Sequence, residues 1–158
     1  MEFRYDTYCG LNCCACPVLG ANERGDKEWI KKVAEDEKCT PNDLRCHGCK
    51  TEMVAMYCTD CEMRLCARKK GIEFCNECKD FPCETIKSFR NDKSPHHSVI
   101  FRNLRTIKEK GLEAWLEEEV GRWACKKCGA RFYWYSKTCS ECGAELYNSV
   151  KEEKDLDI

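Results

Sequence analysis

The sequence lacks the features of a membrane-spanning or secreted protein and lacks a recognisable set of acid–base or nucleophilic catalytic residues. No hydrophobic run approaches the ~18 residues that cross a bilayer, and the first residues lack the apolar stretch of a secretory signal. These two absences predict a cytoplasmic protein with no membrane partner. Histidine is scarce, with three residues among 158, and none stands at a spacing typical of catalysis. The sequence therefore favours a non-catalytic role.

Cysteine, in contrast, is in large excess. The chain has 17 cysteines, and a share above ~8–10% usually marks a secreted disulfide scaffold. Here the odd count would leave one thiol unpaired, and many cysteines form CxxC pairs, a spacing that places two ligands on one metal ion. Because disulfides are rare in a reducing compartment, the sequence predicts metal ligands. It predicts a fold that depends on about three or four zinc ions, each with up to four thiolate ligands.

The most specific motif lies near the end of the chain, where two CxxCG turns stand close together at Cys125–Gly129 and Cys139–Gly143. The glycine after each pair permits the positive φ that such turns need. Between the turns, Arg131–Tyr135 is rich in strand-forming residues. The pattern predicts a β zinc ribbon over residues 122–148, in which four thiolates close a tetrahedral, structural site.

The first part of the chain carries the other thirteen cysteines, and their partners are harder to assign. The simplest grouping follows sequence order: Cys46, Cys49, Cys58 and Cys61; then Cys66, Cys75, Cys78 and Cys83; then Cys9, Cys13 and Cys16 with a fourth ligand from Cys14, Cys39 or His47. The CxxxCxxC spacing of the third group is also the spacing with which radical-SAM enzymes bind a four-iron cluster. One iron–sulfur cluster is therefore the alternative cofactor at that group.

Short helices are expected between these motifs. A helix is predicted over 26–38, and a second should begin at a capping box formed by Thr59 and Glu62 and end at Gly71. A third should open at Pro82. The cysteine-free stretch is predicted to be a helical hairpin, because two apolar stripes are separated by a glycine.

The hairpin carries basic side chains on its first helix and acidic side chains on its second. The opposite charges favour antiparallel packing of the two helices. The alternative is that the basic stretch Lys87–Lys110 binds nucleic acid. Against that alternative, 27 Lys and Arg are balanced by 28 Asp and Glu over the whole chain, and a general phosphate-binding surface needs net positive charge.

Together these signals predict a small, irregular, metal-stabilised α+β fold with short helices, zinc knuckles, a helical hairpin and a C-terminal β zinc ribbon. The predicted segments are a cysteine-rich multi-zinc domain at 1–92, a hairpin linker at 93–121, the ribbon at 122–148 and a charged, frayed tail at 149–158.

Four motifs carry a family resemblance. They are CGLxCxxC at Cys9–Cys16, CxGC at Cys46–Cys49, the run Cys66–Gly71 and CxxCxxFPC at Cys75–Cys83. Over residues ~5–90 the chain resembles an uncharacterised cysteine-rich family of bacteria and archaea, the domain of unknown function DUF3795. The resemblance implies a small cytoplasmic metal-binding domain of a prokaryote and implies no activity. It implies as ligands Cys9, Cys13, Cys16, Cys46, Cys49, Cys58, Cys61, Cys66, Cys75, Cys78 and Cys83, and leaves out Cys14 and Cys39.

The sequence thus favours a structural zinc-binding protein that acts as a non-catalytic adaptor for another protein. The alternatives are a nucleic-acid-binding zinc ribbon protein and an iron–sulfur redox protein that uses the CxxxCxxC motif. The predicted metal ligands are the eleven family cysteines together with Cys125, Cys128, Cys139 and Cys142.

Overall fold

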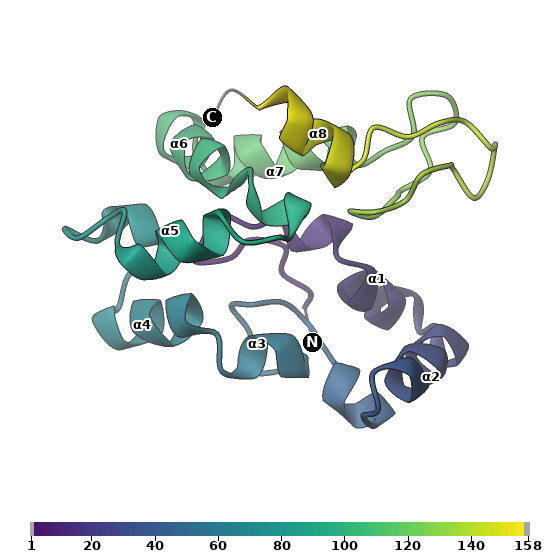
Figure 1. Ribbon diagram of the computed structural model, residues 1–158, viewed down its shortest axis with the longest axis horizontal. Coiled ribbons are helices and arrows are strands. Elements are labelled where there is room, and N and C mark those ends of the chain that lie inside the picture. The colour runs from purple at the N-terminus through teal and green to yellow at the C-terminus, as the bar shows by residue number, and fades with distance from the viewer. Residues whose placement is uncertain (1, 157–158) are drawn as a thin grey trace.

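Short helices make up about half of residues 2–156, the part of the chain that the computed structural model describes (Figure 1). The longest helices have eleven residues. The α-helices are α1 (Pro17–Arg24), α2 (Lys27–Asp36), α3 (Met56–Thr59), α4 (Glu62–Lys70), α5 (Glu84–Arg90), α6 (Ile100–Lys110), α7 (Leu112–Arg122) and α8 (Ser149–Asp155). Single 3₁₀ turns lie at Cys13–Ala15, Pro41–Leu44, Cys75–Glu77 and Pro95–His97. No helix in the described part of the chain has the length and apolar character needed to cross a membrane.

The helices form two groups around a central element. In Figure 1, α6, α7 and α8 lie together on one side, α2, α3 and α4 lie on the other, and α5 lies between them. The buried Ile86 of α5 shares a hydrophobic cluster with Met63 of α4 and with Leu104 of α6. α5 therefore joins the two groups through its apolar face.

The predicted α+β fold with a C-terminal β zinc ribbon is wrong. Residues 2–156 contain no β-strand, and the region of the expected ribbon has only two isolated antiparallel bridges, Ala124 with Arg131 and Thr138 with Glu145. The fold is helical, with an irregular C-terminal segment. We call residues 123–148 of this segment the C-terminal module.

The physical reason is that the strand-forming residues of the module have no common partner. The backbone N–H of Phe132 donates to the carbonyl of Trp123, whereas the N–H of Trp134 donates to the carbonyl of Ala15, far away in the sequence. A strand needs a continuous ladder to one neighbour. Contacts with the rest of the protein replace that ladder here.

The ends of α2 and α4 can be compared with the helix ends predicted from the sequence. The first predicted helix is confirmed as α2, whose N-terminus is capped by the Asp26 carboxylate accepting from the N–H of Trp29 at 3.1 Å. The predicted end of α4 is also confirmed, because Gly71 adopts the left-handed conformation there. The capping box is wrong: Cys61 is the N-cap of α4, and the Thr59 hydroxyl donates to a carbonyl of the preceding turn.

The remaining helices differ from the predictions in their details. α5 begins at Glu84, two residues after Pro82, which was expected to open the helix. The expected hairpin appears as α6 and α7, which meet at Gly111 and pack against each other. Lys110 of α6 and Glu118 of α7 form an ion pair at 2.6 Å.

The segment expected to fray as a charged tail instead contains α8, which the side chain of Asn148 caps. Glu152 of α8 is buried, and its carboxylate accepts from Arg102 of α6 at 2.7 Å and from Arg122 of α7 at 3.1 Å. Two cations therefore offset the cost of burying this charge. The last part of the expected tail, residues 157–158, lies outside the described residues.

The buried side chains form three small clusters, not one core. One lies in the C-terminal module around Trp123 and Phe132, one under α1 and α2 around Leu19 and Leu44, and one between α4 and α6 around Ile100. A small core gives limited stability, and such proteins usually depend on crosslinks, metals or partners. Cysteines occur in all three clusters.

A glycine substitution tests how tightly the CxGC turn is held. Gly48 has φ +121°, and a Cβ there would lie 2.1 Å from the carbonyl oxygen of Arg4. Gly71 also has positive φ, but nothing lies within 4 Å of its Cβ position. We expect Gly71→Ala to cost about 1–2 kcal/mol, the price of the left-handed conformation alone, and Gly48→Ala to cost clearly more. Urea denaturation of both variants measures the difference, and equal costs would contradict the close approach.

Candidate metal centres

The C-terminal module contains a complete four-thiol site. The Sγ atoms of Cys125, Cys128, Cys139 and Cys142 all lie within 4.8 Å of one another. Two of the separations are 3.6 Å, from Cys125 to Cys142, and 3.5 Å, from Cys128 to Cys139. A tetrahedral zinc ion with Zn–S bonds of ~2.3 Å places its ligands about 3.8 Å apart. The four sulfur atoms are thus spaced for one metal ion.

Two equivalent turns present these thiols. The N–H of Gly129 donates to the carbonyl of Cys125 at 2.7 Å, and the N–H of Gly143 donates to the carbonyl of Cys139 at 2.9 Å. Both glycines have positive φ, 78° and 73°, as the sequence predicted. The local spacing C-x-x-C-G therefore forms the same turn twice.

Backbone amides in the turns favour the metal-binding form of the first thiol of each CxxC pair. Hydrogen bonds from the backbone of Cys128 and then Lys127 hold the pKa of Cys125 below its ordinary value. Backbone bonds from Cys142 and then Glu141 do the same to the pKa of Cys139. A lower pKa increases the thiolate fraction, and thiolate is the form that binds metal.

The module is fixed to the N-terminal segment by polar contacts. Arg131 donates through Nε to the carbonyl of Cys14 at 2.7 Å and pairs with Glu23 of α1. Tyr133 lies directly over Gly20 of α1, where a Cβ would come within 2.5 Å of the phenol ring. α1 therefore approaches the module closely because position 20 has no side chain.

Aromatic contacts hold the other side of the module. Trp134 stacks on His96, with ring centroids 4.0 Å apart, and the hydroxyl of Tyr135 lies 2.5 Å from His96 Nδ1. Burial, together with the charge of His97, lowers the pKa of His96 to about 3. No sequence signal predicted this contact, since adjacent histidines at a helix start are usually exposed. His96 is neutral and acts as an aromatic packing surface.

The thiols of the N-terminal region are divided between two hydrophobic clusters. Cys13 and Cys16 pack against the cluster that contains Cys46, whereas Cys9 belongs to the cluster against which Cys61 and Cys75 pack. Within residues 2–156, the C-terminal set is the one group of three or more possible ligand atoms that satisfies the 4.8 Å spacing. The first cysteine of CxxxCxxC thus packs in a different hydrophobic cluster from the other two, although the charges of both Cys9 and Cys16 raise the pKa of Cys58.

Burial strongly disfavours ionisation of these thiols in the absence of a cation. The pKa of Cys13 is raised well above its ordinary value by burial first, and then by the negative charges of Cys16 and Cys49. The pKa of Cys58 is raised to about 12 by burial and by Cys46. Thiolates gathered in this way need a positive charge between them, which a metal ion supplies.

Two buried cations fix the CxGC turn. Arg64 of α4 donates to the carbonyl of Cys49 at 2.8 Å. Lys50 has a side chain that is 2% exposed, lies 3.1 Å from Asp6 and stands 3.8 Å from the ring centroid of Phe74. Sequence reasoning missed both residues, because Lys and Arg are almost always exposed unless paired.

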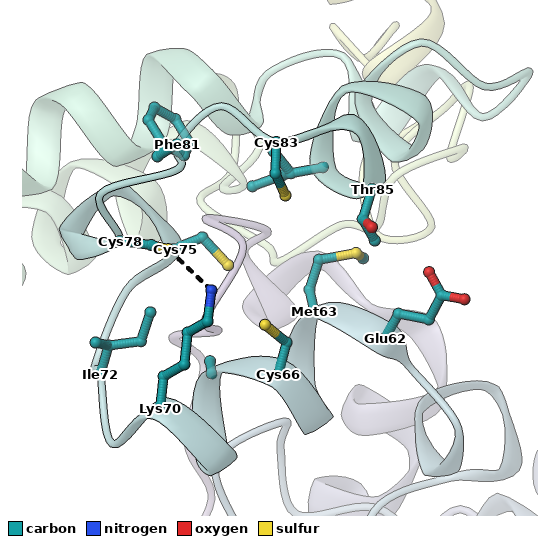
Figure 2. Close-up of a pocket in the computed structure, with 12 residues that line it drawn as sticks. Glu62, Met63, Cys66, Lys70, Ile72, Cys75, Cys78, Phe81, Cys83 and Thr85 are labelled. Carbon is teal, nitrogen blue, oxygen red and sulfur yellow. Dashed lines mark hydrogen bonds between the residues drawn. The ribbon is translucent and has the colours of Figure 1, made fainter.

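One group of the sequence-order prediction shares a single cavity, namely Cys66, Cys75, Cys78 and Cys83. All four line one cavity between α4 and the loop before α5 (Figure 2). The ammonium group of Lys70 donates to Cys78 Sγ at 3.1 Å. This hydrogen bond lowers the pKa of Cys78, after a larger contribution from the backbone of Asp80.

The three open candidates for a further ligand have other contacts. Cys14 is buried, and its sulfur accepts from the amide of Asn12 at 3.4 Å. Cys39 packs, partly buried, against the cluster under α1 and α2. The ring of His47 stacks on Phe3 with centroids 4.4 Å apart. These contacts are those of packing residues.

These features define a small, helical, cysteine-rich protein with a four-cysteine group that can hold a metal ion. Residues 5–88 match the family described as protein of unknown function (DUF3795), so the chain belongs to that family. The resemblance stated from the four motifs is thereby confirmed, and the four-cysteine module lies outside the matched residues. No curated protein and no solved structure matches the chain.

The partly buried His96 predicts a pH dependence of stability. The folded protein keeps His96 neutral down to about pH 3, whereas the unfolded chain takes up a proton below about pH 6.5. Stability from this group is therefore complete above pH 6.5 and falls as the pH decreases, by up to about 1.4 kcal/mol per pH unit. Chemical denaturation between pH 7 and pH 5 measures the slope.

The control is His96→Phe, which keeps the stack on Trp134 and cannot be protonated. Other ionisable groups lie near the imidazole, namely His97, Asp92 and Tyr135, and protons compete with metal for thiolates. The difference between the two proteins removes these common effects. Identical slopes would show that His96 is not kept neutral by the fold.

Proposed function

We propose that this protein is a structural zinc protein whose C-terminal module is held by one zinc ion on Cys125, Cys128, Cys139 and Cys142. The observation that carries the proposal is the convergence of all four sulfur atoms within 4.8 Å on two equivalent turns. Four thiolates fill the tetrahedral coordination of zinc and leave no position for a catalytic water. Such a site stabilises structure.

The module needs this ion because its own core is small. Trp123, Phe132 and Leu146 are its large buried side chains, and two isolated bridges supply its backbone pairing. Apparent binding free energies of about 10–16 kcal/mol for a structural zinc ion exceed the stability of most domains, about 5–15 kcal/mol. Zinc in the site would hold residues 125–128 against residues 139–142.

We further infer that the module presents a surface to another protein. Tyr135 and Tyr147 are 44% and 43% exposed, and each hydroxyl is held, by His96 at 2.5 Å and by Asp155 at 2.6 Å. Rigid, exposed tyrosines give large contact areas at low entropic cost and are enriched in interfaces. The adaptor role rests on these two side chains.

Ion pairs within the protein that involve the basic stretch Lys87–Lys110 favour a protein partner over nucleic acid. Arg102 pairs with Glu152 at 2.7 Å, and Lys110 pairs with Glu118 at 2.6 Å. Lys87 pairs with Glu84 of the same helix. Three of the seven Lys and Arg residues of the stretch are thus paired with carboxylates of the protein and are less available to phosphates, whose binding depends on free cationic side chains.

Metal analysis tests the zinc site. We expect Cys128→Ser to lose one zinc ion per chain, because three remaining thiolates and a hydroxyl bind far more weakly, and to expose the aromatic residues of the module to solvent. Elemental analysis and tryptophan fluorescence give the two readouts. The matched control is Cys39→Ser, which should retain the zinc content of the wild-type protein. An unchanged zinc content in Cys128→Ser would refute the site, and iron in place of zinc would correct the metal.

A paired substitution tests the adaptor role. We expect the full-length protein to crosslink to a protein partner in its native extract, and Tyr135→Ser combined with Tyr147→Ser to reduce that product at least tenfold. The control is Tyr57→Ser, which removes an exposed tyrosine from α3. Equal crosslinking by all three proteins, or salt-dependent retention of nucleic acid on filters with no protein product, would end this assignment.

A further inference from the structure

A second thiol site lies in the cavity between α4 and the loop that leads to α5. Cys66 and Lys70 are four residues apart on α4 and therefore face the same side of the helix. The loop contributes the other three thiols from Cys75 to Cys83. Figure 2 shows the sulfur atoms of Cys66, Cys75 and Cys83 directed into one space, with the Lys70 ammonium group beside them.

The loop that carries these thiols is held in place by backbone hydrogen bonds. The N–H of Cys75 donates to the carbonyl of Tyr8 at 2.7 Å, and the N–H of Cys78 donates to the carbonyl of Cys75 at 3.1 Å. The N–H of Phe81 donates to the carbonyl of Cys78 at 3.1 Å. The positions of Cys75 and Cys78 are therefore set by the fold.

The spacing of the four thiols differs from that of a single-ion site. In the C-terminal module all four sulfur atoms lie within 4.8 Å of one another. Among the described residues that line the cavity, no three ligand atoms lie so close together. Together with eight other residues, the four cysteines line a cavity of about 140 Å³. A zinc ion with Zn–S bonds of ~2.3 Å leaves no such space between its ligands, whereas an apolar cavity of ~150 Å³ accommodates a molecule the size of benzene.

The rest of the lining is suited to an inorganic cluster. Most of the remaining wall is apolar, with Met63, Ile72, Phe81 and Ile86, and the polar side chains of Glu62 and Thr85 complete it. Apolar side chains on this side limit the access of water to a metal centre. Lys70 supplies an N–H···S hydrogen bond and a positive charge at Cys78. Hydrogen bonds to sulfur are one of the means by which proteins set the reduction potential of a cluster.

We propose that Cys66, Cys75, Cys78 and Cys83 bind a [4Fe–4S] cluster in this cavity. Each thiolate binds a different iron atom of the cluster, so the four sulfur atoms stand farther apart than around one ion. Lys70 donates to the Cys78 sulfur and stabilises the added negative charge of the reduced cluster. The proposal is independent of the zinc site in the C-terminal module.

Anaerobic reconstitution tests the proposal. The full-length protein is incubated with ferrous iron and sulfide under reducing conditions, desalted, and analysed for iron, sulfide and zinc. We expect about four iron and four sulfide ions per chain, as for any [4Fe–4S] site, with broad visible absorption and a paramagnetic signal after reduction by dithionite. Absence of iron and sulfide, or zinc bound to these four thiols in their place, would overturn it.

Variants separate this site from the others. Cys66→Ser and Cys83→Ser alter exposed cysteines and should each lower the iron content several-fold while circular dichroism shows retained helices. Cys39→Ser should keep the full iron content. Cys128→Ser should lose zinc and keep iron, so a failure of the zinc assignment is distinguished from a failure of the cluster. Loss of iron in Cys128→Ser alone would assign the iron to the C-terminal module and reject the cluster.

A second readout tests the role of Lys70. We expect Lys70→Met, which removes the charge and the N–H donor but keeps the length of the side chain, to shift the midpoint potential of the cluster to a more negative value. Lys69→Met changes the neighbouring exposed lysine of α4 and should leave the potential unchanged. The same potential in both variants would show that no cluster sulfur accepts a hydrogen bond from Lys70.

Discussion

Thiols that face one another inside the protein are the constraint on which the rest of the structure depends. Cys9, Cys46, Cys125 and Cys139 are buried, and they belong to three separate hydrophobic clusters. Burial raises the pKa of Cys9 above its ordinary value, and a bound cation opposes that effect because it stabilises the deprotonated sulfur. Helices of at most eleven residues are marginal alone in water. The arrangement of the helices is thus tied to the arrangement of the sulfur atoms.

Sequence reasoning succeeded where the information is local. The helix that begins after Asp26 has its own capping residue, and α4 ends at Gly71 because only glycine adopts the required φ readily. The CxxCG turns of the module were predictable because their spacing alone brings two sulfur atoms together. The group that lines the cavity, from Cys66 to Cys83, is short enough in sequence to be recognised as one set.

Sequence reasoning failed where contacts between distant segments determine the local structure. The run Arg131–Tyr135 has high strand propensity, but its side chains dock on α1 and on His96, and tertiary contacts of this kind outweigh propensity. Glu152 belongs to a segment whose composition is that of a solvated tail. It is buried only because Arg102 and Arg122 converge on it from two other helices, and no local pattern encodes that convergence.

The packing of Cys9 has a consequence for the order of events during synthesis. Cys61 and Cys75, which pack against its cluster, come so much later in the sequence that more than a third of the chain is synthesised before either exists. Cys9 is therefore made long before its neighbours, and its contacts with them form only after the later segment has been synthesised.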